Sequence, residues 1–390
     1  MRIFLAIPRS PNAAFDSDLW KRNLHDPLVA LGHDVVLFHE GVQPLFDLDP
    51  GAPATAEPRA RFEAGFRAAV EEADRAGRLE LIVTYFSDSH LTNDAIGAVR
   101  TRIAPVVNFF CNNVHQFHLV RRSARAYTGC LVPEEAALAS YRAAGAEPIF
   151  FPMAAHPEVY RPLDLPQRYE ATFAGQRYGD RTGGILALRE AGVDAHAFGQ
   201  GWTPAPAREG TPGAAGGGGA GGAWTRIARA ASLVASGRNP LAAAADVKAY
   251  ERLRARHAAS LHPIVDDDAY VRLFSESAIS LGFLILGDTH RTARPLRQIR
   301  LREFEAPMAG AFYVTGFLEE IGRHYEIGRE IVCYRSLEEM TEQCRYYLAH
   351  PDERERIRRA GHDRARRDHT WTRRFEDLFA DLKRRGVVRG

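Results

Sequence analysis

The segment that says most about the fold is Arg302-Glu303-Phe304-Glu305-Ala306-Pro307-Met308-Ala309-Gly310, which is followed directly by the apolar run 311–314. A carboxylate inside an apolar, helix-like segment is costly to bury unless it is paired or hydrogen-bonded. Glu305 is therefore expected to hold a ligand, and its two carboxylate oxygens suit a pair of sugar or ribose hydroxyls. The alternative is a helix N-terminal turn in which Glu303 and Glu305 face solvent.

Strand and helix signals alternate over the residues that precede this segment. In the first 160 residues, strands are predicted at 3–7, 34–39, 79–86, 105–110, 129–132 and 148–151, and helices at 20–31, 61–76 and 134–144. Strands that are apolar throughout are typical of a parallel sheet covered on both faces. Residues 1–160 are therefore predicted to form one doubly wound α/β domain.

The same pattern restarts after the proline-containing link 161–166. Strands are predicted at 171–174, 195–199, 278–286, 311–315 and 330–334, and helices at 183–191, 337–348 and 372–382. Ser336 and Glu339 form a capping box for the second of these helices. The pattern predicts a second Rossmann-like domain over 168–370 and a terminal helical segment over 371–390.

An insert at about 203–262 interrupts the second domain. Residues 203–223 are rich in Pro, Ala and Gly, a composition that buries too little apolar surface to fix one conformation. Residues 224–236 have the pattern of an amphipathic helix. We expect that helix to dock on its own domain, and peripheral contact with a membrane surface is the alternative.

The 302–310 segment resembles the R-x-F-E-x-x-x-x-G signature of GT-B glycosyltransferases, in the spore-maturation, CgeB-like branch. The resemblance covers about 171–378 with an interruption, and the first 160 residues more loosely. It implies two tandem Rossmann-like domains that face a central cleft, with a C-terminal helix that crosses back to the first domain. It also implies a nucleotide-sugar donor, whose ribose Glu305 would bind.

The donor's phosphates are expected near the loop that follows the first strand of the second domain. Gly175 opens this loop, and glycine lets backbone N–H groups approach an anion at a helix N-terminus. Arg177 and Arg181 would add bidentate contacts to phosphate oxygens. The resemblance places an arginine at Arg181 and the signature glycine at Gly310. A plain strand-to-helix turn is the alternative for this loop.

The sequence departs from better-known retaining GT-B enzymes in two ways. Those enzymes carry two glutamates eight residues apart, whereas Arg297 stands eight residues before Glu305. They also place an arginine–lysine pair on the diphosphate, and the only lysine between 171 and 310 is Lys248, in the insert. Arginines such as Arg294, Arg297 and Arg302 are therefore expected to bind the diphosphate, and retaining stereochemistry does not follow.

Polar residues in the first domain are candidates for the acceptor side. Asp88 and His90 follow a predicted strand, and residues beyond the carboxyl end of a parallel strand line the ligand crevice. His90 is a candidate general base, and either His90 or Asp88 is expected to position or deprotonate the acceptor hydroxyl; helix capping by Asp88 or Ser89 is the alternative. Asn113 and His115 follow the next strand and are expected at the same edge. The loop 8–16 is expected to help enclose the acceptor.

Metal and cofactor signals are weak. Cys111, His115 and His118 have ligand-like spacing, but aromatic packing and loop polarity explain them better. The three D-x-D strings, at 16–18, 47–49 and 266–268, lack the context of a metal–diphosphate site, and the last one is expected to cap a helix at 269–275. We therefore predict neither a metal nor a cofactor, only the nucleotide sugar as co-substrate.

Bulk properties exclude several classes of protein. A formal net charge of +2 gives no strong field for nucleic acid or an anionic membrane. The four cysteines are scattered, which fits a reducing compartment and a cytoplasmic location. The N-terminal apolar run is too short for a signal peptide and is expected to be a strand.

The function predicted from these features is metal-independent transfer of a sugar from a nucleotide-diphosphate sugar to an unidentified acceptor. Two alternatives stay open. One is a nucleotide-sugar 2-epimerase with the same two domains, and the other is a nucleotide-binding or scaffold protein that keeps the fold without turnover. The missing lysine and first glutamate favour the last reading, and the intact 302–310 segment opposes it.

Overall fold

The computed structural model describes residues 1–9, 18–203 and 239–388, and it divides into two compact units. The first unit contains residues 1–161, 299–308 and 363–390, and the second contains 162–298 and 309–362. The predicted loop at 8–16, the D-x-D string at 16–18 and the predicted helix at 224–236 lie wholly or mostly outside the described residues. No helix of the described ranges is both long and apolar enough to cross a membrane.

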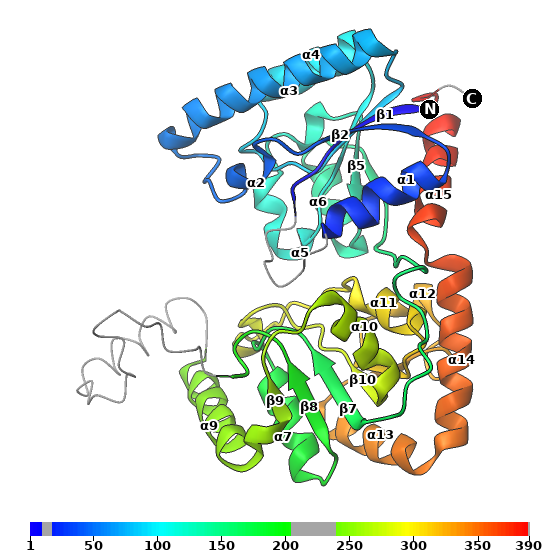
Figure 1. Cartoon of the computed structure of the whole chain (residues 1–390). Helices are drawn as coiled ribbons and strands as arrows, with labels where there is room; N and C mark the ends of the chain where they lie inside the picture. The colour runs from blue at the N-terminus through cyan, green and yellow to red at the C-terminus, as the bar shows by residue number, and fades with distance from the viewer. Residues whose placement is uncertain (10–17, 204–238, 389–390) are drawn as a thin grey trace, which may run out of the picture. The chain divides into compact units, whose positions relative to one another are not determined.

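The first unit is built on a parallel sheet (Figure 1). Its strands run in the order β2-β1-β3-β4-β5-β6, with bounds β1 Arg2–Ala6, β2 Asp34–Phe38, β3 Leu81–Thr84, β4 Val106–Phe109, β5 Gly129–Val132 and β6 Pro148–Phe150. Phe4 of β1 pairs in register with Val36 on one side and Ile82 on the other. The continuous apolar runs of the sequence thus lie where a sheet buried on both faces requires them.

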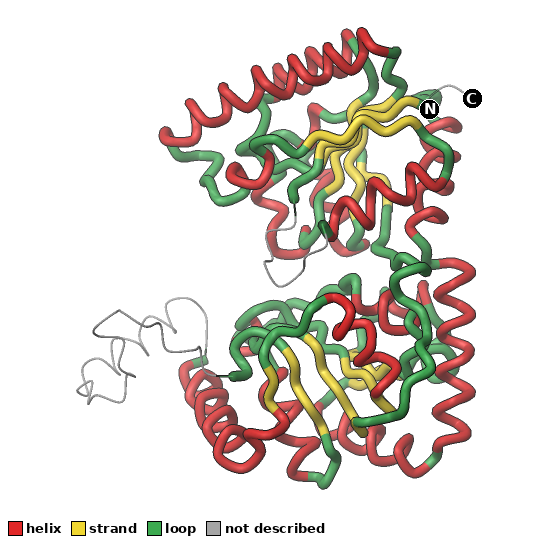
Figure 2. The backbone as a smooth tube through the Cα atoms, in the orientation of Figure 1, coloured by secondary structure: helices red, strands yellow, loops and turns green. Residues whose placement is uncertain are grey.

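Helices cover both faces of this sheet (Figure 2). They are η1 Lys21–His25, α1 Asp26–Ala30, α2 Val42–Leu45, η2 Pro53–Thr55, α3 Ala56–Ala76, α4 Asn93–Arg102, α5 Asn113–Gln116, η3 Phe117–Leu119, η4 Ala124–Ala126, η5 Glu135–Ala137 and α6 Leu138–Ala143. Phe62 and Phe66 on α3 meet Phe4 and Phe38 of the sheet in edge-to-face contacts. These rings bury the apolar stripe of a long, otherwise polar helix.

The C-terminal helix α15 (Trp371–Arg384) packs within the first unit. The residue before it, Thr370, forms a parallel bridge with Ala155, and the backbone N–H of Ala155 donates to His369 O at 3.0 Å. Phe375 packs its ring 5.4 Å from that of Phe151. The guanidinium of Arg374 donates to Pro152 O at 3.1 Å, so the end of the chain is tied to the segment that leaves β6.

The second unit repeats the architecture. Its parallel strands run β12-β11-β10-β7-β8-β9, with bounds β7 Tyr169–Ala174, β8 Ala195–Phe198, β9 Leu261–His262, β10 Ser277–Leu281, β11 Tyr313–Gly316 and β12 Val332–Tyr334. Its helices are α7 Arg181–Glu190, α9 Pro240–His257, η6 Ala258–Ser260, α10 Asp267–Glu276, η7 Thr289–Arg291, α12 Ile321–His324 and α13 Leu337–Ala349. Two parallel doubly wound sheets confirm the predicted α/β class.

Two predicted caps are confirmed. Ser336 Oγ accepts from the N–H of Glu339 at 3.2 Å at the start of α13. Asp266 accepts from the N–H of Ala269 at 2.8 Å and starts α10, so the third D-x-D string caps a helix, as expected. Each such cap stabilises a helix end by about 1 kcal/mol.

Two helices differ from the expected division at 168–370. The first is α11 (Arg302–Met308), which groups with the first unit. The second is α14 (Pro351–Asp368), a helix that the sequence patterns did not predict and within which the chain passes from the second unit back to the first. Ion pairs three or four residues apart on its surface, such as those of Glu355 with Arg358 and Arg359, support α14. The predicted domain boundaries stay predictions.

Gly184 permits the closest approach of α7 to the sheet. A Cβ at Gly184 would lie 2.5 Å from Cε1 of Phe283, whereas a Cβ at Gly183 would lie 3.3 Å from the flexible Leu337 Cδ1. Phe283 is buried and cannot move cheaply, so we expect Gly184→Ala to lower the free energy of unfolding by about 2 kcal/mol. Gly183→Ala is the matched control and should be neutral or slightly stabilising. Urea unfolding of both variants measures the difference, and equal midpoints would contradict this packing.

Candidate functional site

The loop 175–180 lies at the carboxyl end of β7, as the sequence predicted, but Gly175 has no free backbone group. Its N–H donates to Phe198 O at 2.7 Å, and its carbonyl accepts from the indole N–H of Trp202 at 2.8 Å. The N–H of Gly175 is therefore committed to the neighbouring strand. The expectation that it contacts phosphate is wrong for this conformation of the loop.

Arg177 and Arg181 are also committed to the protein. Arg177 Nε donates to Gly201 O at 2.7 Å, and its guanidinium lies 3.9 Å from the ring centre of Tyr250. Arg181 is buried, donates from Nη1 to Gln176 O at 2.5 Å, and stacks 3.6 Å from the ring centre of Tyr178. Both arginines shape the loop. Arg181 is therefore a loop-positioning residue, whereas Arg177 is bonded only through Nε, so its predicted phosphate contact stays a prediction.

A hairpin-like excursion over 285–297 lies against the loop 175–180 that follows β7. Ile285 and Arg297 form an antiparallel bridge, and the N–H of Leu286 donates to Leu296 O at 2.9 Å. The excursion touches the loop after β7, because a Cβ at Gly179 (φ +66°) would lie 3.2 Å from Gly287 O. The sequence was expected to form one strand over 278–286. The strand ends instead at Leu281, and the excursion begins shortly after it.

Arg294 and Arg297 are the arginines that this excursion exposes. Both side chains are exposed, and within the described ranges neither takes part in a hydrogen bond or ion pair. The charge of Arg297 acts on Asp180, which precedes the first turn of α7. The predicted donor residue Arg297 therefore lies near a helix N-terminus, where an anion is favoured.

Asp180 is a residue that the sequence analysis did not single out. It stands at the N-cap position of α7 without making a side-chain capping bond, and its Oδ1 is buried with no hydrogen-bond partner in the described part of the chain. Burial raises the pKa of Asp180, and its backbone hydrogen bond and the positive charges of Arg181 and Arg297 offset this only in part. An unsatisfied buried carboxylate oxygen beside a loop is a signal of a binding site that a sequence does not display.

His290 lies beside it in η7 and is held by a carboxylate. Its Nε2 lies 2.7 Å from Asp246 Oδ2, which also accepts from Arg291 Nε at 2.7 Å. Burial alone would raise the pKa of Asp246, but the bonds from His290 and Arg291 outweigh it and lower that pKa. Because the ionised carboxylate only accepts, Nε2 carries the hydrogen. The other nitrogen, Nδ1, is buried without a partner among the described residues.

The signature segment forms the short helix α11 with its acidic residues inside. Glu303 and Glu305 are 3% and 5% exposed, so the solvent-facing alternative is wrong. Glu303 Oε2 accepts from the N–H of Arg300 at 2.8 Å and closes the start of the helix. Arg302 is partly buried at the first helical position. Glu305 thus lies buried in the first turn, and its role in holding a ligand stays a prediction.

Gly310 ends this segment for a conformational reason. Its φ is +73°, and a Cβ would lie 2.8 Å from Pro162 Cγ. Its carbonyl accepts from Arg358 Nη1 at 2.9 Å. Gly310 therefore turns the chain into β11, and no observation connects it directly with a ligand.

His90 is a core residue, and its predicted role as general base is corrected. The ring is fully buried and stacks 4.8 Å from the ring centre of Phe86. Nδ1 accepts from the N–H of Ser87 at 3.1 Å, and Nε2 lies 2.9 Å from Val42 O, to which it donates. Burial lowers the pKa of His90 to about 4. Both nitrogens are occupied, so neither is available to an acceptor hydroxyl.

Asp88 does not cap the helix that follows β3, because Thr92 caps α4, and it holds a distant turn instead. Its two oxygens accept from the backbone N–H groups of Arg122 and Ser123, each at 2.9 Å, and from Ser123 Oγ at 2.6 Å. Burial raises the pKa of Asp88, and the bonds from Ser123 and Arg122 act in the opposite direction. The carboxylate holds the turn that leads into η4, so its predicted catalytic role is also corrected.

Asn113 and Glu134 form a buried network at the carboxyl edge of the first sheet. Asn113 Nδ2 donates to Glu134 Oε2 at 2.8 Å, and its Oδ1 accepts from Tyr141 at 2.7 Å. Glu134 also accepts from the N–H of Asn112 at 2.7 Å, and burial raises the pKa of Glu134 to about 7. Asn113 therefore supports the loop after β4. The sequence analysis missed Glu134 because it reads as the first residue of a helix.

His115 is the predicted acceptor-side residue that stays accessible. It lies on α5, directly after the Asn113 network, and is exposed. Burial lowers its pKa, and the positive charges of Arg300 and His118 lower it further. Since Arg300 precedes α11 and belongs to the same unit, the structure brings His115 near the start of the signature segment. A neutral imidazole at this position can accept a proton.

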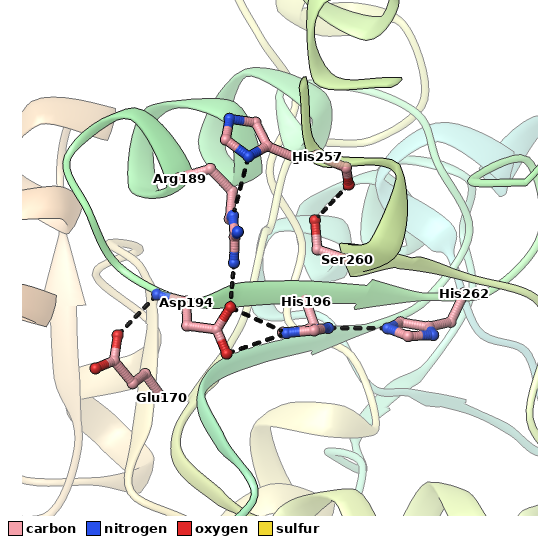
Figure 3. A network of polar contacts seen from close by, with 7 residues as sticks. All are labelled: Glu170, Arg189, Asp194, His196, His257, Ser260 and His262. Atoms are coloured by element: carbon pink, nitrogen blue, oxygen red, sulfur yellow. Dashed lines mark hydrogen bonds and ion pairs between the residues drawn. The ribbon is translucent and has the colours of Figure 1, made fainter. Parts of the chain in front are cut away.

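In the second unit, a separate polar network surrounds the start of β8 (Figure 3). His196 Nδ1 lies 2.9 Å from His262 Nε2, and its Nε2 lies 3.2 Å from both oxygens of Asp194, which Arg189 also contacts. The network joins α7 to the edge strands β8 and β9. Within the described ranges, no three His, Cys, Asp or Glu side chains are arranged to hold a metal ion.

Comparisons with known proteins support the fold that this geometry indicates. Residues 226–380 match the model of the glycosyl transferase-like family. Curated protein sequences gave no match. The family match includes the excursion 285–297, α11 and α14.

Solved structures match along almost the whole chain. Sucrose-phosphate synthase from Thermosynechococcus elongatus has a TM-score of 0.61 at 14% identity, with 98% of each chain covered. HepE from Anabaena, in complex with UDP, has a TM-score of 0.56 at 11% identity, covering 98% of this chain and 100% of that one. A putative UDP-N-acetylglucosamine 2-epimerase from Listeria monocytogenes has a TM-score of 0.51 at 11% identity, covering 99% and 97%. The chain has the GT-B fold, as the sequence predicted.

Proposed function

We propose that this protein is a glycosyltransferase that moves a sugar from a nucleoside-diphosphate sugar to an acceptor, without a metal ion. The observation that carries the proposal is the GT-B fold along the whole chain, combined with the glycosyl transferase-like match over 226–380. HepE, one of the similar structures, was solved with UDP-glucose, which supports the same class of donor here. The CgeB-like branch and a cytoplasmic location remain part of this proposal, on the evidence of the sequence.

The donor's diphosphate is proposed to bind at the carboxyl edge of the second sheet. Arg294 and Arg297 are exposed there, and a guanidinium can bind a phosphate through two parallel hydrogen bonds. The N-terminus of α7 adds a favourable dipole. Charge that develops on the leaving diphosphate would be stabilised by groups already in place, the type of stabilisation that preorganised sites provide. Glu305 is proposed to bind the ribose hydroxyls.

The acceptor hydroxyl is proposed to meet His115, since His90 and Asp88 are committed to the core. An exposed imidazole whose pKa is lowered by burial, Arg300 and His118 is mostly neutral at pH 7 and can take a proton. The network of Asn113 and Glu134 would hold α5, and therefore His115, in position.

Release of the nucleoside diphosphate tests the proposal. The protein is incubated with UDP-glucose, UDP-N-acetylglucosamine and GDP-mannose, with and without EDTA. A transferase is expected to release UDP or GDP slowly to water, at a rate that EDTA does not change. An epimerase would convert a nucleotide sugar into its epimer with the nucleotide still attached. If neither product forms, the result supports a nucleotide-binding protein without turnover.

Removing the carboxylate of Glu305 tests the ribose assignment. We expect Glu305→Ala to weaken nucleoside diphosphate binding about tenfold, because two hydroxyls lose a charged acceptor. Glu303→Ala is the matched control: its carboxylate closes the helix start, so stability should fall while binding by the folded protein changes little. Calorimetric titration measures both. Unchanged affinity in Glu305→Ala would remove Glu305 from the site.

A further inference from the structure

The residues Asp180 and His290 present two buried acceptor atoms in one region of the second unit. Asp180 Oδ1 has no hydrogen-bond partner in the described part of the chain, and the same holds for His290 Nδ1. A protonated His290 would lower the pKa of Asp180, so the two side chains are neighbours, and the loops that carry them are in contact through Gly179 and Gly287. Buried polar atoms without partners are rare in folded proteins and require an explanation.

The orientation of His290 decides what its free nitrogen can do. Nε2 donates to the Asp246 carboxylate at 2.7 Å, which fixes the ring, and in the neutral ring this leaves Nδ1 as an acceptor. The His290 side chain is 11% exposed, so little water reaches it. Asp246 also pairs with Arg291, and Arg291 pairs with Asp288. These ion pairs hold the Asp246 carboxylate, and therefore the His290 ring, in position.

Asp180 offers a second hydrogen-bond acceptor beside His290. Its carboxylate makes no capping bond to α7, although it occupies the N-cap position. Neighbouring positive charges from Arg181 and Arg297 compensate its own charge. Asp180 as a whole is partly buried, and its Oδ1 is fully buried. The cluster therefore offers hydrogen-bond acceptors at the edge of the sheet that carries Arg297.

We propose that Asp180 and His290 together bind a vicinal pair of hydroxyl groups on the nucleotide sugar. Two acceptors in one region match two hydroxyl donors, and this inference rests on the proposed function. A diol occurs both in the ribose and in the transferred sugar of such a donor. The two sources have the same chemistry, so the experiment must separate them.

Four proteins are titrated by calorimetry: wild type, Asp180→Asn, His290→Gln and the control Asp266→Asn. Glutamine at 290 keeps an N–H donor for Asp246 but lacks Nδ1, and Asp266 is a helix cap elsewhere in the second unit. The probes are UDP-glucose, UDP and 2′-deoxy-UDP, with GDP-mannose, GDP and 2′-deoxy-GDP as a second series.

Asp180→Asn and His290→Gln are each expected to weaken binding of UDP-glucose or GDP-mannose about tenfold, while Asp266→Asn stays within about twofold of wild type. If the variants weaken binding of UDP or GDP as much and leave binding of the 2′-deoxy form unchanged, the diol is that of the ribose, which Asp180 and His290 would then bind together with Glu305. If UDP and GDP are unaffected, the diol belongs to the transferred sugar. If Asp180→Asn and His290→Gln bind every probe with affinities within about twofold of wild type, the inference is overturned and the proposed function stands. No binding of any probe to wild type would overturn both.

Discussion

Arg297→Ala is expected to weaken the binding of nucleoside diphosphates between about tenfold and a hundredfold, the range that a charged hydrogen bond in a partly desolvated site provides. Arg297 is exposed and bonded to no described residue, while its charge acts on Asp180 at the start of α7. Arg181 is buried in the loop that it shapes, and Arg177 is held on Tyr250 with its Nε bonded to Gly201 O. The phosphate contact therefore falls to the excursion 285–297.

The control for this variant is Arg329→Ala, since Arg329 is exposed in the second unit and pairs with Glu326. It should bind as the wild type does, and raising the salt concentration should reduce the difference between the two variants, because exposed charge contacts are screened. Isothermal titration with UDP and GDP measures both. Equal affinity of Arg297→Ala and wild type would move the phosphate site elsewhere.

The second large effect concerns His90 and acid stability. The pKa of His90 is about 4 in the folded protein and 6.5 in its ordinary state, so the unfolded chain binds a proton that the folded protein excludes. The contribution of neutral His90 to the free energy of unfolding is therefore fully present above pH 6.5. It decreases by about 3 kcal/mol as the pH falls toward 4.

His90→Gln separates this titration from the hydrogen bonds of the ring. The variant should be less stable at pH 7.5 by about 2 kcal/mol, because Ser87 N–H and Val42 O lose well-placed partners. Its stability should also decrease less between pH 6.5 and 4 than that of the wild type. Urea unfolding at several pH values measures both effects, with the exposed His118→Gln as control. The same pH dependence in all three proteins would contradict the assignment of His90 to the core.

The fold was predictable because burial on both faces of a parallel sheet leaves a direct record in the sequence. The run 129–132 is a strand with the predicted bounds, and most other strands differ by one to three residues at an end. The helix α14 escaped prediction because its apolar residues are few and it depends on surface ion pairs. The run 278–286 was taken as one strand, since periodicity does not show where an apolar chain leaves a sheet.

The site was less predictable, because a sequence does not show which polar groups the protein itself satisfies. His90 and His115 both follow strands of the first sheet, yet one is buried with both nitrogens bonded and the other is exposed. Asp180 stands next to Arg181 in the sequence, but only the structure shows its unpartnered oxygen. The signature segment predicted a buried carboxylate at Glu305, and burial at that position is what the structure has.

The most direct test of the central claim is calorimetric titration of the purified protein with UDP, GDP, dTDP and ADP, with and without Mg²⁺. The proposed function predicts binding of one nucleoside diphosphate in preference to the others, with an affinity that Mg²⁺ does not change. Failure of all four to bind would contradict a nucleotide-sugar donor. Binding only in the presence of Mg²⁺ would contradict a metal-independent site built from arginines.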